Sequence, residues 1–348
     1  MDSSEAEDEY HLRRALQLAR RGSPTDINPL VGAVVTDAAG AVVGEGYHRG
    51  AGSPHAEIEA LRAAGPAARG GTVHVTLEPC SHTGRTDPCT DALLGAGVAR
   101  VVFGQTDPNR VAAGGAAILV AAGVRVRAGV LADEALELNR TWTHLMRTGR
   151  PFVTWKFAAT LDGRSAARDG TSRWITGPAA RADVHALRAR CGAVIVGTGT
   201  VLADDPRLTV RGPSRTAVQP LRVVIGRRPI PSGAHVRDGA ARTLVVESHD
   251  AREALAQLAG RGIHHALLEG GPTLAGAFVR DGLVDEVIAY VAPAVLGGGP
   301  SPVADLGIDT IADALRLTLT DVTVVGTDVR ITARPIPQGE GARNALRT

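Results

Sequence analysis

The sequence reads Ser-Pro-His-Ala-Glu at residues 53–57 and Glu-Pro-Cys-Ser-His-Thr-Gly-Arg-Thr-Asp-Pro-Cys at residues 78–89. Each stretch contains the start signal of a helix, a capping Ser53 or Asp87 followed by a proline at the first helical position. An alternating apolar run at residues 72–77 predicts a strand between them. The pattern predicts a strand flanked by two helices, and the first half of the chain is built around this unit.

Four side chains in these stretches carry zinc chemistry. His55, Cys80 and Cys89 are zinc-ligand types, and with a non-ligand glutamate, Glu57, they form the signature of the zinc deaminases. Three protein ligands leave the fourth position for water, whose pKa zinc lowers from about 15.7 toward about 7. Glu57 is then expected to carry protons from that water to the leaving amine. Because residues two apart on a helix point about 200° apart, His55 and Glu57 converge only if the helix end faces the site.

Plainer interpretations of the same residues stay open at this point. The two cysteines could be buried thiols, and a structural zinc could take His74 or His82 as its fourth ligand. The protein could also be a zinc-stabilised binding module, or a nucleic-acid base deaminase with an accessory domain. Glu57 argues against the binding module, and the combination of two helix starts with an intervening strand favours a catalytic zinc.

Composition excludes several classes of protein. The 348 residues include 38 Lys+Arg and 36 Asp+Glu, a formal net charge of +2, and 3% aromatic residues. Nucleic-acid binders typically carry a surplus of positive charge and aromatic side chains on which bases stack, and this composition shows neither feature strongly. No apolar run reaches the roughly 18 residues of a membrane span, and residues 1–9 show no secretory signal. We therefore expect a cytoplasmic globular protein that binds neither nucleic acid nor membrane, and the sequence leaves a homo-oligomer open.

Turn-rich residues 148–151 divide the chain into two expected α/β domains, residues 1–148 and 151–336, followed by a disordered tail at 337–348. In the first domain we expect strands at 31–35, 41–47, 72–77, 100–104 and 124–130, and helices at 8–21, 53–64, 87–97, 116–122 and 132–147. In the second we expect strands at 152–159, 193–197, 221–225, 243–246, 266–268, 285–291, 315–325 and 328–333, and helices at 179–190, 252–258 and 273–280. This order predicts a sheet covered by helices in each domain, the second with an antiparallel edge.

Two glycine-containing turns in the second domain are candidates for a nucleotide site. Gly197-Thr-Gly-Thr-Val-Leu202 follows a strand, but it lacks the third glycine of a dinucleotide fingerprint and is also typical of a turn into a loop. Glu269-Gly-Gly-Pro-Thr-Leu274 joins a strand to a helix whose N-terminus can bind phosphate. By itself, the second pattern also fits an ordinary strand-to-helix turn.

The sequence resembles the bifunctional riboflavin-biosynthesis deaminase/reductase family. Eight residues, not the two of common deaminases, separate Cys80 from Cys89, and Asn28-Pro-Leu-Val-Gly32 and His48-Arg-Gly-Ala-Gly-Ser-Pro-His55 also fit that family. Residues 156–163, 172–176, 200–211 and 269–277 look like its reductase half. The chain departs from the family where Arg110 follows Asp107-Pro-Asn109 in place of a second proline, which affects the detail of that loop.

The resemblance implies a three-layer α/β/α domain like cytidine deaminase and an α/β domain similar to dihydrofolate reductase. It implies zinc-dependent removal of an amino group from a diaminopyrimidinone ribosylamine phosphate, followed by NADPH-dependent reduction of its ribosyl group to a ribityl chain. For the deaminase substrate it implies contacts from Asn28, His48, His82 and Arg85. For NADPH it implies contacts from Ala158, Trp174, Thr200, Asp204, Gly271, Pro272, Thr273, Leu274, Ala275, Gly276 and Ala277. For the reductase substrate it implies contacts from Ser172, Arg188, Leu208, Arg211 and Glu269.

Some of these assignments have plainer alternatives. Trp174 could be a core residue, Asn28 an ordinary turn residue before proline, and any single arginine a solvated surface side chain. Arginine forks nevertheless suit the phosphate of the expected substrate. Arg227 and Arg228, which follow the expected strand at 221–225, are candidates for the 2′-phosphate of NADPH.

Overall fold

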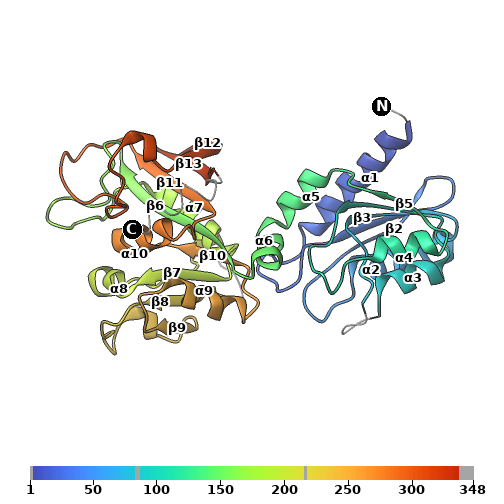
Figure 1. Cartoon of the computed structure of the whole chain (residues 1–348), viewed down its shortest axis with the longest axis horizontal. Coiled ribbons are helices and arrows are strands. Elements are labelled where there is room, and N and C mark those ends of the chain that lie inside the picture. Colours follow the sequence, from blue (N-terminus) through green and yellow to red (C-terminus); the bar gives the residue numbers. More distant parts are fainter. Residues whose placement is uncertain (1–2, 83–86, 215–217, 337–348) are drawn as a thin grey trace. The chain divides into compact units, whose positions relative to one another are not determined.

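The computed structural model describes residues 3–82, 87–214 and 218–336. Arg85 and the tail expected at 337–348 lie outside the described residues. The chain divides into two compact units, Met1–Gly149 and Arg150–Thr348 (Figure 1). Among the described residues, no helix combines the length and the apolar character needed to cross a membrane.

The first unit contains a five-stranded mixed sheet in the order β2-β1-β3-β4-β5. Antiparallel pairs join β1 to β2 and β1 to β3, and parallel pairs join β3 to β4 and β4 to β5. The strands are β1 Gly32–Thr36, β2 Val42–Tyr47, β3 Thr72–Leu77, β4 Arg100–Gln105 and β5 Arg125–Ala128. All five residues of β1 are buried, because helices cover both faces of the sheet.

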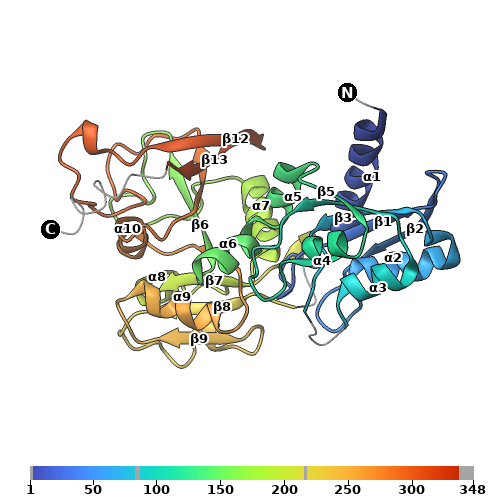
Figure 2. The same ribbon diagram turned by 45° about the vertical axis from the view of Figure 1, so that its right-hand side comes forward.

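Six α-helices surround this sheet: α1 Ser3–Ala19, α2 Ala56–Ala64, α3 Cys89–Ala96, α4 Gly115–Ala121, α5 Ala132–Leu138 and α6 Arg140–Thr148. Alternate residues of a strand face opposite sides, so Ala33 packs with α2, α3 and α4 while Val34 packs with α1 (Figure 2). The three-layer arrangement expected for the first half is therefore confirmed.

The helix starts differ from the sequence prediction. The first helix of the site begins at Ala56 with His55 at the N-cap position, and Ser53 does not cap it; its hydroxyl instead donates to the Gly50 carbonyl at 2.7 Å. Cys89 is the first residue of α3, with Pro88 at its N-cap. The predicted caps Ser53 and Asp87 are thus wrong: Ser53 belongs to a turn with Gly50, and the N-cap positions are taken by His55 and Pro88.

The second unit contains an eight-stranded sheet in the order β12-β13-β11-β6-β10-β7-β8-β9. Strands from β11 to β9 pair in parallel, and β13 and β12 add the antiparallel edge that the sequence predicts. The strands are β6 Phe152–Thr160, β7 Ala193–Gly197, β8 Leu221–Ile225, β9 Thr243–Val246, β10 His265–Leu268, β11 Glu286–Ala292, β12 Leu317–Val325 and β13 Asp328–Pro335.

The α-helices of the second unit are α7 Pro178–Ala189, α8 Thr198–Asp204, α9 Ala251–Ala259 and α10 Pro272–Arg280. One core cluster packs α9 and α10 on the sheet, and a second packs α7 and α8 on its other face. Helix α8 stands where the sequence suggested a turn into a loop. Short 3-10 turns lie at Gly65–Ala68, Gly212–Ser214, His235–Arg237 and Ile311–Asp313.

Candidate active sites

The first candidate site lies at the starts of α2 and α3, next to the end of β3. The ligand atoms of His55, Cys80 and Cys89 all lie within 4.8 Å of one another. His55 Nδ1 is 3.1 Å from Cys89 Sγ and 3.6 Å from Cys80 Sγ. Nitrogen and sulfur donors gathered in this way suit a tetrahedral zinc ion.

Hydrogen bonds within the cluster prepare a thiolate. The Cys89 thiol, the Cys89 backbone N–H at 3.4 Å and the His55 ring lower the pKa of Cys80 to about 4, against the opposing effect of burial. Donation to Cys80, together with burial, raises the pKa of Cys89. A thiolate is the form of cysteine that binds metal, so the donor set fits zinc.

Neither histidine considered as a fourth ligand belongs to this group. His74 is buried in β3, with Nε2 3.2 Å from the Asp8 carboxylate. His82 follows Cys80 but does not join the cluster, and within the described residues the group has three members. An open fourth position is the arrangement of a catalytic zinc.

Glu57 is buried on the first turn of α2, where its carboxyl group lies within hydrogen-bonding reach of the Cys89 thiol. Burial raises its pKa, against the effects of the His55 charge and a backbone hydrogen bond. The start of α2 therefore faces the cluster of His55, Cys80 and Cys89. This is the condition under which the side chains of His55 and Glu57, two residues apart, can reach the same site.

Asn28 and His48 lie beside the cluster of His55, Cys80 and Cys89. His48 Nδ1 donates to the Pro54 carbonyl at 3.0 Å, and its Nε2 accepts from the Asn28 side-chain amide at 3.0 Å. The His48 ring stands edge-on to His55, with ring centroids 5.7 Å apart. His82 Nδ1 is buried without a hydrogen-bond partner in the described part of the chain.

The second candidate site is a cleft of about 1650 Å³ in the second unit. It opens at the carboxyl ends of β6, β10, β7 and β8, where open parallel sheets bind ligands. Of the residues that the resemblance implies, the cleft is lined by Ala158, Ser172, Trp174, Arg188, Thr200, Asp204, Leu208, Arg211, Glu269, Gly271, Pro272, Thr273, Leu274 and Ala277. Ala275 is on the core side of α10 and Gly276 packs against Ala304, so these two residues do not line the cleft.

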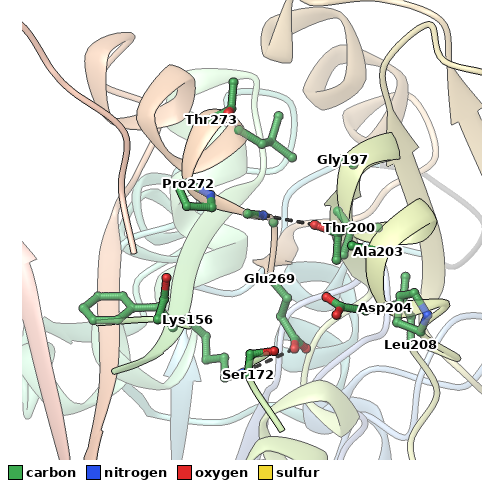
Figure 3. Close-up of a pocket in the computed structure, with 18 of the residues that line it drawn as sticks. Lys156, Ser172, Gly197, Thr200, Ala203, Asp204, Leu208, Glu269, Pro272 and Thr273 are labelled. Carbon is green, nitrogen blue, oxygen red and sulfur yellow. Dashed lines mark hydrogen bonds and ion pairs between the residues drawn. The ribbon is translucent and has the colours of Figure 1, made fainter. Parts of the chain in front are cut away.

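Glu269 is a carboxylate in the cleft that pairs with two positively charged side chains. Its carboxylate accepts from Arg188 Nε at 2.6 Å and Nη2 at 3.0 Å, and lies 3.5 Å from Lys156 Nζ. Burial acts to raise the pKa of Glu269, but the charges of Arg188 and Lys156 lower it to about 2. Figure 3 shows Lys156 and Ser172 close to Glu269, with Asp204 on the other side.

A hydrogen bond joins the two turns that carry most of the expected NADPH contacts. The Gly271 backbone N–H donates to Thr200 Oγ1 at 3.1 Å, which ties the start of α10 to α8 (Figure 3). Gly271 is the N-cap of α10, and Pro272 is its first residue. The amides at this helix start are therefore held at the wall of the cleft.

Trp174 is not a core residue. Its side chain is 69% exposed, and the Arg181 guanidinium lies 4.5 Å from its ring centroid. The alternative that Trp174 belongs to the core is therefore excluded, and its ring is free to contact a ligand in the cleft that it lines.

Five of the arginines that line the cleft form two groups. Burial and the charges of Arg188 and Arg207 lower the pKa of Arg211, so these three side chains share one region. Arg227 and Arg228 follow β8, are exposed, and make no ion pair or hydrogen bond with the residues that the structure describes. The Arg228 guanidinium lies over Gly199, where a Cβ would be 2.5 Å from its Nη2.

Lys156 and Asp107 are among the polar residues at the sites that were not singled out from the sequence. Lys156 lines the cleft and pairs with Glu269. It is the sole lysine among 38 basic residues, and this exception was the signal in the sequence that could have pointed to it. Asp107 is buried, and burial together with the charges of Glu78 and Cys80 raises its pKa to about 6. From the sequence, Asp107 was only part of the loop that departs from the family pattern at Arg110.

Two family models match the chain. Residues 5–105 match the cytidine and deoxycytidylate deaminase zinc-binding region, and residues 151–331 match the RibD C-terminal domain. These matches, with the solved structures below, confirm the fold class expected for each half.

Curated relatives and solved structures are similar over nearly the whole chain. The riboflavin biosynthesis protein RibD of Mycobacterium tuberculosis is 51% identical over 86% of this chain and 89% of the relative, and that of Escherichia coli K12 is 44% identical over 93% and 98%. A solved Acinetobacter baumannii RibD has a TM-score of 0.88 at 40% identity, covering 96% of this chain and 100% of that one. A Thermotoga maritima diaminohydroxyphosphoribosylaminopyrimidine deaminase/5-amino-6-(5-phosphoribosylamino)uracil reductase has a TM-score of 0.85 at 34% identity, with the same coverage.

Proposed function

The chain belongs to the RibD family of riboflavin biosynthesis proteins, and on that basis we propose that the zinc cluster and the arginine-lined cleft are its two active sites. It is a bifunctional enzyme with a zinc-binding deaminase domain and an NADPH-dependent reductase domain. The observation that carries the assignment is the convergence of His55, Cys80 and Cys89 within 4.8 Å, with Glu57 buried beside them.

The first reaction removes the 2-amino group of 2,5-diamino-6-(5-phosphoribosylamino)pyrimidin-4(3H)-one by hydrolysis. Zinc, when bound by the three ligands, lowers the pKa of a water molecule and so supplies the nucleophile. Glu57 accepts one proton from that water and delivers it to the ring nitrogen, and it then transfers the proton of the added hydroxyl group to the amine, which leaves as ammonia. Asn28 and His48 orient the pyrimidine, and their mutual hydrogen bond keeps His48 in one tautomer. His82 and Arg85 complete the substrate contacts.

The second reaction reduces the deaminated product to 5-amino-6-(5-phosphoribitylamino)uracil. NADPH supplies the hydride for ribose C1′, and the protein aligns the reactants and excludes water. The amides at the start of α10 bind a cofactor phosphate, as helix N-termini do, and Thr200 holds that start in place. Ala158, Trp174 and Asp204 complete the cofactor contacts.

The group of cations around Arg188 and Arg211 binds the substrate phosphate, because guanidinium forks pair with phosphate oxygens. Glu269 is held ionised by Arg188 and Lys156, and so presents a fixed acceptor to the substrate. Ser172 and Leu208 complete the substrate contacts. Arg227 and Arg228 stand apart from this group and are assigned to the 2′-phosphate of NADPH.

We also propose that the enzyme works in the cytoplasm on a free nucleotide-like substrate rather than on nucleic acid. The near balance of 38 basic and 36 acidic residues supports the exclusion of nucleic acid, since a net charge of only +2 gives the chain no large surplus of positive charge for a polynucleotide.

A coupled assay tests the two-site assignment. The diaminopyrimidinone substrate without NADPH should release ammonia and stop, and adding NADPH should start cofactor oxidation. RNA supplied in its place should release no ammonia. Ammonia from RNA but none from the free substrate would overturn the assignment in favour of a nucleic-acid deaminase.

A further inference from the structure

Glu78 is a buried carboxylate two residues before the zinc ligand Cys80, and the mechanism above does not use it. Its side chain is 5% exposed and accepts three backbone hydrogen bonds. Oε2 accepts from the Asp107 N–H at 3.2 Å, and Oε1 accepts from the N–H groups of Gly114 at 3.2 Å and Ala116 at 3.1 Å. The carboxylate therefore holds both ends of one segment, residues 107–116.

The middle of that segment is held by the residue on the other side of Cys80. The Ser81 backbone N–H donates to the Ala112 carbonyl at 3.1 Å, and the Ser81 hydroxyl donates to the Ala113 carbonyl at 2.9 Å. Gly115 completes the contact, because a Cβ there would lie 1.9 Å from the Pro79 carbonyl oxygen. Residues 107–115 thus pack directly against residues 78–81, the segment that contains Cys80.

The segment also forms part of the wall of the zinc site. Ala112 is 5% exposed and packs in one buried cluster with Cys80 and Cys89. A shift of this segment would remove the packing behind both sulfur ligands. Groups that hold metal ligands from behind matter because their loss typically costs about 10–100-fold in metal affinity or activity.

We propose that Glu78 is a positioning residue of the deaminase: by holding residues 107–116 against Pro79 and Cys80, it keeps the two cysteine ligands in the geometry that retains zinc. The chemistry requires a carboxylate. All three partners are N–H donors, and an ionised carboxylate accepts at both oxygens. A glutamine would keep one acceptor and turn an NH₂ group against a backbone N–H, which leaves a buried donor unpaired.

Two substitutions test this from opposite sides. Glu78→Gln removes one acceptor, and Gly115→Ala pushes the segment away from Pro79 without touching the carboxylate. Gly95→Ala in α3 is the matched control for the second, because a Cβ there meets nothing within 4 Å. Asp8→Asn is the control for the first, since Asp8 is a buried carboxylate that binds Arg100 and Arg127.

The readouts are zinc loss to a chelator, hydrogen exchange of the amides of residues 107, 114 and 116, and the two activities. We expect Glu78→Gln and Gly115→Ala to lose zinc about 10–100-fold faster, to exchange these amides faster and to lower deaminase kcat about 10–100-fold. Reductase activity on the deaminated substrate should stay within twofold in both. Gly95→Ala should match the unmutated enzyme, and Asp8→Asn should lower Tm without speeding zinc loss.

The proposal rests on the assignment of the first unit as a zinc deaminase. Measurements on the unmutated enzyme show whether that assignment fails or only the positioning role of Glu78 fails. If the unmutated chain neither holds zinc nor deaminates, the assigned function fails. If it does both, and Glu78→Gln and Gly115→Ala retain zinc and kcat like Gly95→Ala, the positioning role fails. Should Asp8→Asn lose zinc as fast as Glu78→Gln at equal Tm, the effect is general destabilisation and the proposal is overturned.

Discussion

The side-chain amide of Asn139 pairs with both backbone polar groups of Leu30. Its Oδ1 accepts from the Leu30 N–H at 2.8 Å, and its Nδ2 donates to the Leu30 carbonyl at 2.8 Å. Asn139 is 3% exposed and separates α5 from α6, where a single helix was predicted. This pairing fixes the chain two residues after Asn28, whose side chain binds His48 beside the cluster of His55, Cys80 and Cys89.

Replacing Asn139 with aspartate should therefore weaken both the fold and deaminase substrate binding. Aspartate keeps the acceptor for the Leu30 N–H but turns an oxygen against the Leu30 carbonyl. We expect a loss of about 1–3 kcal/mol in the first domain, the usual cost of an unsatisfied buried group. We also expect KM for deamination to rise while reduction is unchanged. Calorimetry and steady-state kinetics measure this, and an unaltered KM would show that Asn28 does not depend on Leu30.

The purified enzyme should hold about one zinc ion per chain, and Cys89→Ser should bind it far more weakly. The reason is the loss of one of three protein ligands. Metal analysis after dialysis against a chelator measures the effect. Cys191→Ser is the control, because Cys191 is a buried thiol of the second unit. Full zinc retention by Cys89→Ser would remove Cys89 from the ligand set.

Glu57→Gln should separate the two activities. It keeps the size of the side chain but removes the proton carrier, so zinc should stay bound while deamination falls by roughly 10²–10⁴-fold. The cleft lies wholly in the second unit, so reduction of the supplied deaminated substrate should continue at nearly the unmutated rate. Asp204→Ala should lower the rate of reduction and leave the release of ammonia unchanged. Loss of both reactions in a folded Glu57→Gln variant would mean a shared site or an obligatory coupling.

Acid should destabilise the reductase domain through Glu269. The pKa of this carboxyl is lowered from 4.5 to about 2, so the folded state binds its proton more weakly than the unfolded state. The stability it contributes is therefore full above pH 4.5 and is lost as the pH falls toward about 2. At about 1.36 kcal/mol per pKa unit, the contribution is on the order of 3 kcal/mol.

Glu269→Gln should flatten this pH dependence, while losing stability at neutral pH because Arg188 and Lys156 keep their charges without a carboxylate partner. Urea unfolding at several pH values between 2.5 and 7 measures both effects. An equal slope in the variant and the unmutated protein would assign the acid sensitivity to other carboxyl groups.

NADPH should be preferred over NADH, and the double variant Arg227→Ala/Arg228→Ala should lose much of that preference. Both side chains line the cleft and lack partners in the described chain, so a 2′-phosphate is free to pair with them. Equilibrium binding of NADPH, NADH and 2′-AMP measures this apart from turnover. Arg242→Ala, an exposed arginine outside the cleft lining, is the control. Equal affinity for both cofactors in the unmutated enzyme would contradict the assignment.

Local sequence pattern was sufficient for most of the secondary structure. The strands at 72–77, 193–197, 221–225 and 243–246 have the limits that the sequence predicts, because apolar runs this short, bounded by turn residues and rich in β-branched side chains, favour strands over helices. Helix starts were less predictable. Proline after serine or aspartate favours a helix start at both stretches, but the helices begin later, after His55 and Pro88.

Residue chemistry and spacing were sufficient to predict that His55, Cys80 and Cys89 form one cluster, since few side-chain types bind zinc and the motif keeps them within 35 residues; their role as zinc ligands and that of Glu57 stay predictions. Only the tertiary structure decided which residues support the sites. Lys156 meets Glu269 across 113 positions, Asn139 meets Leu30 across 109, and Glu78 meets Ala116 across 38. Such pairs leave no local pattern, because each depends on sheet order and on burial that removes the competing water.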